Sequence, residues 1–190
     1  MEELLVHGGD VQLAARRLGL NPQAFLDASA SLVPWTPPWQ RLGLSAFRDY
    51  PDRSHFLLRQ RIAALHGLDR GCVLAGNGAA ELFTWAARDA ADVGASLLQS
   101  PGFADYQRAL RCWSAPVCEQ PLPLDWADVL PQQLPEPIEA AVLWICNPHN
   151  PTGQLWSRTS LESLLERYAL VICDEAFLPL VPDGERQSLI

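Results

Sequence analysis

The fold is decided by one stretch, residues 140–176, which reads AAVLWIC (140–146), NPHNPTG (147–153), QLWSRTSLESLLERY (154–168) and ALVICDEA (169–176). Its first and last parts are short apolar runs that end in polar groups, which is typical of strands buried on both faces of a sheet. Between these two runs, leucines at 161, 164 and 165 predict a helix over 157–168 with one apolar stripe. The stretch therefore predicts strand, loop, helix and strand, the unit that joins two parallel strands. Ligands bind beyond the carboxyl ends of such strands, where Asn150 and Asp174 stand.

Strand and helix patterns also alternate in the chain before this stretch. The predicted helices lie at 11–20, from Pro51 toward 68, at 80–91 and at 103–113, and the predicted strands at 72–75, 96–100 and 116–123. This order is typical of an α/β layer. We expect a three-layer αβα fold with a mostly parallel sheet, incomplete at its C-terminal side because no closing element follows the last strand.

The first 45 residues differ from the rest of the chain. A short helix pattern is followed there by VPWTPPWQRLG (33–43), whose prolines exclude helix and central strand alike. We therefore interpret residues 1–45 as an N-terminal arm and residues 46–190 as the first part of a larger domain.

Composition excludes several classes of protein. The chain has 190 residues, 48% of them hydrophobic, and a net charge of −8, which argues against binding to nucleic acid or to an anionic membrane. The start MEELLVHGGD is not a signal peptide, and no apolar run reaches the length of a membrane helix. Five scattered cysteines without a C-x-x-C pair indicate a reducing compartment, and the four histidines lack metal-ligand spacing. We expect a cytoplasmic protein without a metal.

Four motifs suggest a ligand site. Gly76 to Glu81 (GNGAAE) is a glycine turn before a helix, which suits a phosphate but is also what a tight turn needs. Phe103 follows a strand and a Pro-Gly turn, where it is either a core residue or a flat surface for an aromatic ligand. The motif NPHNPTG (147–153) is more specific than a plain turn requires. Asp174 is a carboxylate at the end of an apolar run and needs a cationic partner, either an arginine or the cation of a cofactor.

In this order along an α/β chain, the motifs resemble those of the fold-type-I pyridoxal-phosphate enzymes, the aspartate aminotransferase superfamily. Within it, the likeness is closest to the threonine-phosphate decarboxylases of cobalamin synthesis, and the histidinol-phosphate aminotransferases are the alternative. The supporting segments are HGGD (7–10), LDASAS (26–31), YPD (50–52), AGNGAAELF (75–83), SPGFADYQRAL (100–110) and DEAF (174–177).

The resemblance implies a role for each matching residue. Pyridoxal 5′-phosphate would be held by Gly78, Ala79 and Ala80 at its phosphate, Phe103 stacked on the ring, Asn150 at the ring hydroxyl oxygen, Asp174 at the ring nitrogen and Ala176 on the opposite ring face. Tyr50 would reach the cofactor phosphate of a second subunit, which implies a homodimer. His7, Gly8 and Gly9 would lie near a phosphorylated amino-acid substrate.

The chain departs from this family in one decisive way. All 14 of its basic Lys and Arg positions are arginine, so the Schiff-base lysine of the family is absent. Arginine cannot replace it, because its guanidinium stays protonated. The expectation is an amino-terminal half that ends before that lysine, holds the cofactor weakly or not at all, and has no catalytic residue of its own. A non-catalytic interaction protein that kept the half-fold is the alternative of another class.

A smaller departure lies beside the DEA motif. Phe177 stands where many aminotransferases carry a tyrosine, which the decarboxylase interpretation tolerates. Ser31 stands where relatives often carry asparagine, which leaves the substrate contacts of the arm open.

Overall fold

The computed structural model describes residues 8–31, 38, 43–125 and 130–190. The chain divides between His55 and Phe56 into two compact units. This division is geometric, and the interpretation of residues 1–45 as an arm stays a prediction.

The first unit contains the helix α1, Val11–Leu18. Asp10 caps its start, because a carboxylate oxygen of Asp10 accepts a hydrogen bond of 2.9 Å from the amide of Leu13. Gly19 ends the helix in a left-handed conformation with φ of 64°, as the sequence predicts. Among the described residues, 3-10 helices follow at Pro22–Ala24 and Leu44–Phe47. The two tryptophans of the proline-rich segment lie outside the described residues.

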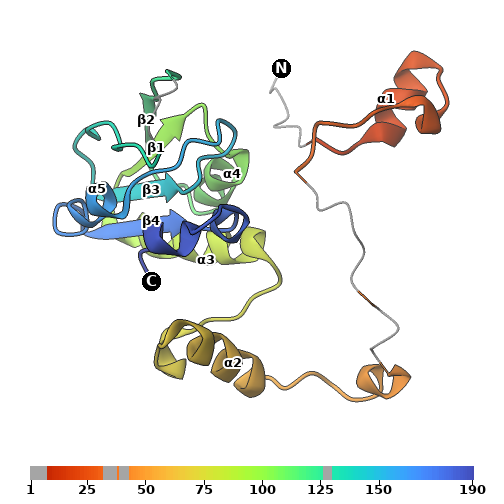
Figure 1. Cartoon of the computed structure of the whole chain (residues 1–190), viewed down its shortest axis with the longest axis horizontal. Coiled ribbons are helices and arrows are strands. Elements are labelled where there is room, and N and C mark those ends of the chain that lie inside the picture. The colour runs from red at the N-terminus through yellow and green to blue at the C-terminus, as the bar shows by residue number, and fades with distance from the viewer. Residues whose placement is uncertain (1–7, 32–37, 39–42, 126–129) are drawn as a thin grey trace. The chain divides into compact units, whose positions relative to one another are not determined.

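The second unit alternates helices and strands along the chain (Figure 1). Its helices are α2 Phe56–His66, α3 Ala79–Val93, α4 Ala104–Cys112 and α5 Arg158–Glu162, and its strands are β1 Ser96–Ser100, β2 Val117–Pro121, β3 Val142–Cys146 and β4 Leu170–Asp174. Further 3-10 helices lie at Arg70–Cys72, Leu178–Leu180 and Gly184–Gln187. In the described part of the chain, no helix is both long and apolar enough to span a membrane.

The four strands form one parallel sheet in the order β2-β1-β3-β4. Val142 at the start of β3 pairs with Ser96 of β1 on one side and with Leu170 of β4 on the other. Because all four strands run the same way, their carboxyl ends meet at one edge of the sheet. The predicted α/β class and parallel sheet are confirmed.

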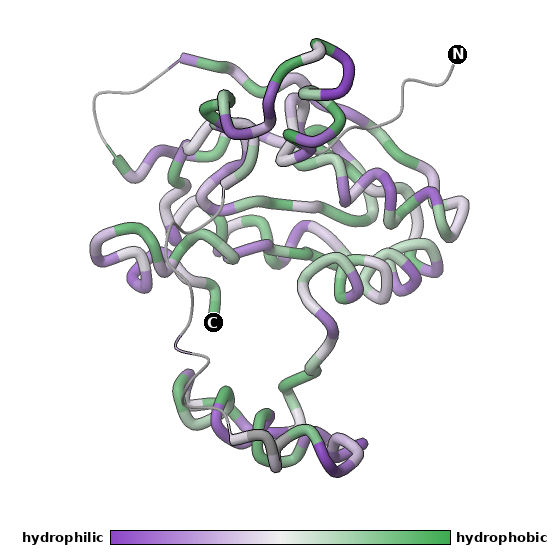
Figure 2. The backbone as a smooth tube through the Cα atoms, turned by 90° about the vertical axis from the view of Figure 1, so that its right-hand side faces the viewer, coloured by the Kyte–Doolittle hydropathy of each residue, from purple (hydrophilic) through white to green (hydrophobic). Residues whose placement is uncertain are grey.

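Helices cover both faces of the sheet, which gives the expected three layers. Alternate residues of β3 point to opposite faces, so Trp144 packs with α3 and α4 while Leu143 and Ile145 pack with the α5 side. All five residues of β3 are buried, as a central parallel strand requires. Figure 2 shows hydrophobic and hydrophilic residues mixed along the helical coils.

Three local predictions are wrong. Residues 72–75 form no strand, because Val73 alone is buried there and no described strand pairs with the segment. The helix predicted from Pro51 begins at Phe56, after a turn in which the carboxylate of Asp52 accepts hydrogen bonds from the amide and hydroxyl of Ser54. The helix predicted over 157–168 ends at Glu162, and Leu165 of its expected apolar stripe is exposed.

Candidate functional site

The carboxyl edge of the sheet brings two polar motifs together. Asp174 is the last residue of β4 and pairs in register with Cys146, the last residue of β3. The amide of Asn147 then donates a hydrogen bond of 2.8 Å to the carbonyl oxygen of Asp174. The NPHNPTG loop and the DEA segment therefore leave adjacent strands side by side.

The Asp174 side chain is held by two hydrogen bonds from uncharged donors. Its Oδ2 accepts a bond of 2.7 Å from the hydroxyl of Tyr106 in α4, and its Oδ1 accepts one of 2.9 Å from the amide of Ala176. Within the described ranges, no arginine or histidine forms an ion pair with this half-buried carboxylate. The arginine partner that a purely structural interpretation requires is thus missing from the described residues.

Phe103 is connected to this carboxylate through Tyr106, which contacts both. It caps the start of α4, and its ring centroid lies 5.5 Å from that of Tyr106 in an edge-on arrangement. The ring of Phe83 from α3 packs against both rings, with its centroid 6.3 Å from that of Phe103 and 5.0 Å from that of Tyr106. Phe103 is only partly buried, so it combines packing against the core with some exposed surface.

Asn147 anchors the NPHNPTG loop. Its side chain is fully buried, and its Oδ1 accepts a hydrogen bond of 2.8 Å from the amide of Trp156 while its Nδ2 donates one of 3.2 Å to the Trp156 carbonyl. The Trp156 indole donates a further bond of 3.1 Å to the Cys146 carbonyl. The first asparagine of the motif is therefore structural, a function that the sequence did not reveal.

The second half of the loop is tied by His149. Its Nδ1 lies 2.8 Å from the hydroxyl of Thr152, and its amide donates to the carbonyl of Gln154 at 2.7 Å. Asn150 stands between these anchored residues with a partly exposed side chain, for which the described part of the chain provides no hydrogen-bond partner. The loop thus fixes the backbone around an amide that is free to bind.

The glycine turn ends at the start of α3. Gly78 precedes the helix with φ of 79° and ψ of 170°, a conformation that only glycine adopts readily, and no side chain caps the helix. Ala79 and Ala80 form the first turn, and their exposed amides have no acceptor among the residues described. The guanidinium of Arg108 in α4 donates to the Ala80 carbonyl at 3.1 Å, which ties this turn to the helix that carries Tyr106.

Burial keeps the ionisable neighbours of Asp174 uncharged. It raises the pKa of Tyr106 well above its usual range, and repulsion from Asp174 and from Cys146 in its ionised form raises it further. Burial likewise raises the pKa of the Cys146 thiol to about 11 and that of Cys173 further. Burial has the opposite effect on His149: it lowers the pKa, because histidine is charged when it is protonated.

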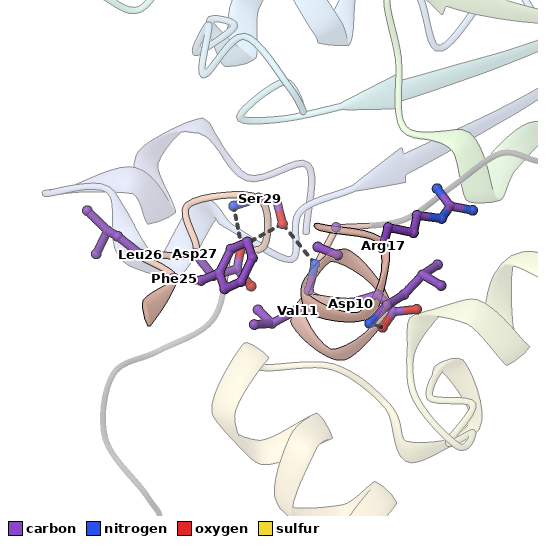
Figure 3. A pocket seen from close by; sticks show the side chains of 11 residues that line it. Asp10, Val11, Arg17, Phe25, Leu26, Asp27 and Ser29 are labelled. Atoms are coloured by element: carbon purple, nitrogen blue, oxygen red, sulfur yellow. Dashed lines mark hydrogen bonds between the residues drawn. The ribbon is translucent and has the colours of Figure 1, made fainter. Parts of the chain in front are cut away.

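The remaining expected residues belong to the first unit. Gly8 and Gly9 line a cavity of about 530 Å³ within that unit, together with Arg17, Phe25 and Asp27 (Figure 3). A side chain at Gly8 would come within 1.7 Å of the Ser29 carbonyl oxygen, so glycine is needed there for packing.

The other two predicted site residues of this unit are Tyr50 and His7. Tyr50 is fully exposed. His7 lies outside the described residues.

Four of the predicted residues are linked by contacts within the second unit. Phe103 reaches Asp174 through Tyr106, Ala176 bonds to Asp174 directly, and Ala80 bonds to α4 through Arg108. Tyr106 itself was not among the predicted site residues. The available signal was a tyrosine one helical turn after Phe103, but its partner is 68 residues away in the sequence.

This arrangement is that of an α/β protein whose polar motifs gather at the carboxyl edge of a parallel sheet, the edge at which ligands bind in such folds. The profile of the aminotransferase class I and II family matches residues 34–188, and the chain belongs to this family. Members of the family bind pyridoxal 5′-phosphate.

Two curated proteins have the same percentage identity to the chain over different shares of its length. Threonine-phosphate decarboxylase of Salmonella typhimurium is 32% identical over 93% of this chain and 51% of its own length. Histidinol-phosphate aminotransferase of Desulfitobacterium hafniense is 32% identical over 80% of this chain and 46% of its own length. The chain thus spans about half the length of the curated relatives it matches.

A solved structure agrees with this assignment. L-Threonine-O-3-phosphate decarboxylase from Porphyromonas gingivalis is 27% identical with a TM-score of 0.59, over 73% of this chain and 43% of that one. The chain therefore reproduces part of the aminotransferase fold.

Proposed function

We propose that residues 56–190 hold pyridoxal 5′-phosphate at the carboxyl edge of the sheet. The proposed contacts are the amides of Gly78, Ala79 and Ala80 to the phosphate, Phe103 and Ala176 on the two ring faces, Asn150 to the ring hydroxyl oxygen and Asp174 to the ring nitrogen. The whole chain of 190 residues includes no lysine, so the binding proposed for residues 56–190 is non-covalent.

The observation that carries this proposal is the state of Asp174. Its two oxygens accept hydrogen bonds only from uncharged donors, and no cation among the described residues balances its charge. A half-buried carboxylate needs a positive partner. A protonated pyridine nitrogen supplies that charge.

The start of α3 suits the phosphate for an independent reason. The first amides of a helix lack intrahelical partners and carry the positive end of the helix dipole, so they attract anions. At Ala79 and Ala80 these amides are exposed, and Gly78 leaves no side chain to block them.

The cofactor, when bound, supplies an acceptor for electrons from a bond that breaks at the α-carbon of an amino acid. The chain's own contribution is to hold the ring and its charges. Asp174 keeps the ring nitrogen protonated, Asn150 donates to the ring oxygen, and Phe103 limits tilting of the ring. None of these residues breaks the bond itself.

For the whole protein, we propose decarboxylation of L-threonine O-3-phosphate, as a homodimer in the cytoplasm. The support is the match with a decarboxylase over 93% of the chain and Phe177 next to the DEA motif. Tyr50 would then contact the cofactor phosphate of the second copy, and His7, Gly8 and Gly9 the substrate. Transamination of histidinol phosphate is the second candidate, because an aminotransferase is equally identical in sequence.

The cofactor proposal is tested by titrating the chain with pyridoxamine 5′-phosphate, which needs no lysine, in a calorimeter. Asp174→Asn removes one charge and is expected to weaken binding by roughly 10- to 100-fold, the value of a hydrogen bond to a charged group. Glu175→Gln, a carboxylate change at the next residue, is the control and should leave affinity within about twofold. Equal affinity of the wild type and Asp174→Asn would refute the proposed ring-nitrogen contact.

The reaction class is tested separately with the two substrates. L-Threonine O-3-phosphate and L-histidinol phosphate are each titrated into the chain that is saturated with cofactor. Tighter binding of the threonine derivative supports the decarboxylase, and the reverse order supports the aminotransferase.

A further inference from the structure

Tyr106 is a buried residue next to the proposed site to which no cofactor contact is assigned. It lies in α4 with 6% of its surface exposed, and its hydroxyl donates a hydrogen bond of 2.7 Å to Oδ2 of Asp174. The two residues belong to different layers of the fold, the helix layer and the sheet. The hydrogen bond therefore connects α4 to the carboxyl end of β4.

The ring of Tyr106 has little freedom to move. It is enclosed by Phe83 at 5.0 Å and Phe103 at 5.5 Å, both edge-on, and by Trp144 at 5.3 Å, tilted by 37°. Such aromatic contacts favour defined relative orientations of the rings. A hydroxyl on a ring held in this way occupies a defined position.

Both oxygens of Asp174 are consequently bound by donors from separate segments. Tyr106 holds Oδ2 from α4, and the amide of Ala176 holds Oδ1 from the segment after β4. A carboxylate that accepts a hydrogen bond at each oxygen cannot rotate about its Cβ–Cγ bond without losing one of them. Removal of the Tyr106 donor leaves a single bond, which permits rotation.

Burial raises the pKa of Tyr106 above its usual range, so its hydroxyl keeps its proton near neutral pH. The hydroxyl is therefore the donor of this hydrogen bond and Asp174 the acceptor.

We propose that Tyr106 is a positioning residue, whose hydroxyl holds the Asp174 carboxylate in the single orientation that the proposed ring-nitrogen contact requires. The inference rests on the proposed cofactor site. It goes beyond that site in assigning orientation of the charge partner to a residue that does not touch the cofactor. Since the Tyr106 ring also packs against Phe103, one side chain supports both the stacking residue and the charge partner.

The test compares Tyr106→Phe with Tyr168→Phe. Tyr168 is the matched control because it is 7% exposed and its hydroxyl donates to the Ile138 carbonyl at 3.0 Å, on the other face of the sheet. Affinity is measured for pyridoxamine 5′-phosphate and for its analogue with CH in place of the ring nitrogen. Tyr106→Phe is expected to weaken binding of the first roughly tenfold and of the analogue less than about twofold. Tyr168→Phe should change neither.

A second readout needs no cofactor. Hydrogen exchange of the Ala176 amide, followed by NMR, should accelerate in Tyr106→Phe, because its acceptor is then free to rotate, and should stay unchanged in Tyr168→Phe. Equal losses for both cofactor forms would overturn the inference, since Tyr106 would then act by packing alone. If the wild type binds no pyridoxamine 5′-phosphate, the proposed function fails. The exchange rate then decides: acceleration supports the hold on Asp174, and an unchanged rate overturns it.

Discussion

The loop after β3 and the turn before α3 are proposed to contact the same cofactor, but they are built in opposite ways. In the loop, Asn147 and His149 are buried, and their side chains bind the Trp156 backbone and the Thr152 hydroxyl. In the turn, Asn77, Gly78 and Ala79 are all exposed, and the shape is set by glycine. The Asn150 side-chain amide needs a defined direction to bind, and buried side chains hold its loop in one conformation. A backbone cradle for a phosphate needs only a permitted conformation and open space.

The comparison predicts its largest effect at the two asparagines. Asn147→Ala removes both hydrogen bonds to Trp156 and leaves a buried amide without an acceptor, which we expect to destabilise the chain by about 3 kcal/mol. Asn77→Ala, at an exposed position of the glycine turn, should stay within about 0.5 kcal/mol. Urea unfolding of both variants measures the difference. Similar losses at the two positions would contradict the proposed distinction between loop and turn.

The backbone of the turn is tested by Gly78→Ala. We expect it to lower the free energy of unfolding by about 2 kcal/mol, through backbone conformation alone, because no atom lies within 4 Å of the added carbon. Gly67→Ala is matched, with φ of 66° and equally open space, but lies after α2. Both variants should lose stability, and only Gly78→Ala should weaken pyridoxamine 5′-phosphate. Equal affinities of the two variants would argue against phosphate binding at α3.

The anchored loop should also respond to pH through His149. Burial lowers its pKa, so the folded chain binds this proton less readily than the unfolded chain. Its contribution to stability is therefore complete above the ordinary pKa near 6.5 and decreases as pH falls below that value, by at most about 1.4 kcal/mol per pH unit. Unfolding measured between pH 8 and pH 5 should show a smaller slope for His149→Gln than for the wild type. Identical slopes would show that His149 titrates alike in both states.

The smallest expected effect concerns Glu81 in the first turn of α3. Its carboxylate accepts a hydrogen bond from the Asn77 amide and places a negative charge beside the proposed phosphate. Glu81→Gln should raise the affinity for pyridoxamine 5′-phosphate by about threefold, while stability falls by about 0.5 kcal/mol through loss of a favourable dipole interaction. Asp89→Asn makes the same charge change further along the helix and should affect neither quantity. An unchanged affinity for Glu81→Gln would place the phosphate elsewhere.

The parallel sheet was predictable from local patterns. The strands predicted at 96–100 and before Asn147 both form: β3 is buried along its whole length and β1 over its first three residues. The polar residues that follow these strands stand at the carboxyl edge. The failed strand at 72–75 had a similar composition. It forms no strand because a strand has to pair with a neighbouring strand, and the sequence of a single segment does not specify that neighbour.

The end of α5 shows the same limit. The leucine pattern continues past Glu162, yet the hydroxyl of Tyr168 binds the Ile138 carbonyl and the amide of Ala169 binds the Ala141 carbonyl at 3.0 Å. These hydrogen bonds fix the chain at the start of β4, so the helix ends before it reaches Tyr168. Tertiary contacts override a helical pattern when the next strand has a defined starting point.

The sequence by itself determined the class of fold, the glycine turn and the two polar motifs, because burial and turn chemistry are local properties of residue types. The tertiary structure alone decided that Tyr106 meets Asp174 and that Asn147 meets Trp156. A hydrogen bond needs its two atoms within about 3 Å. Such placement depends on how a helix packs on a sheet, which no pattern of residues along the chain specifies.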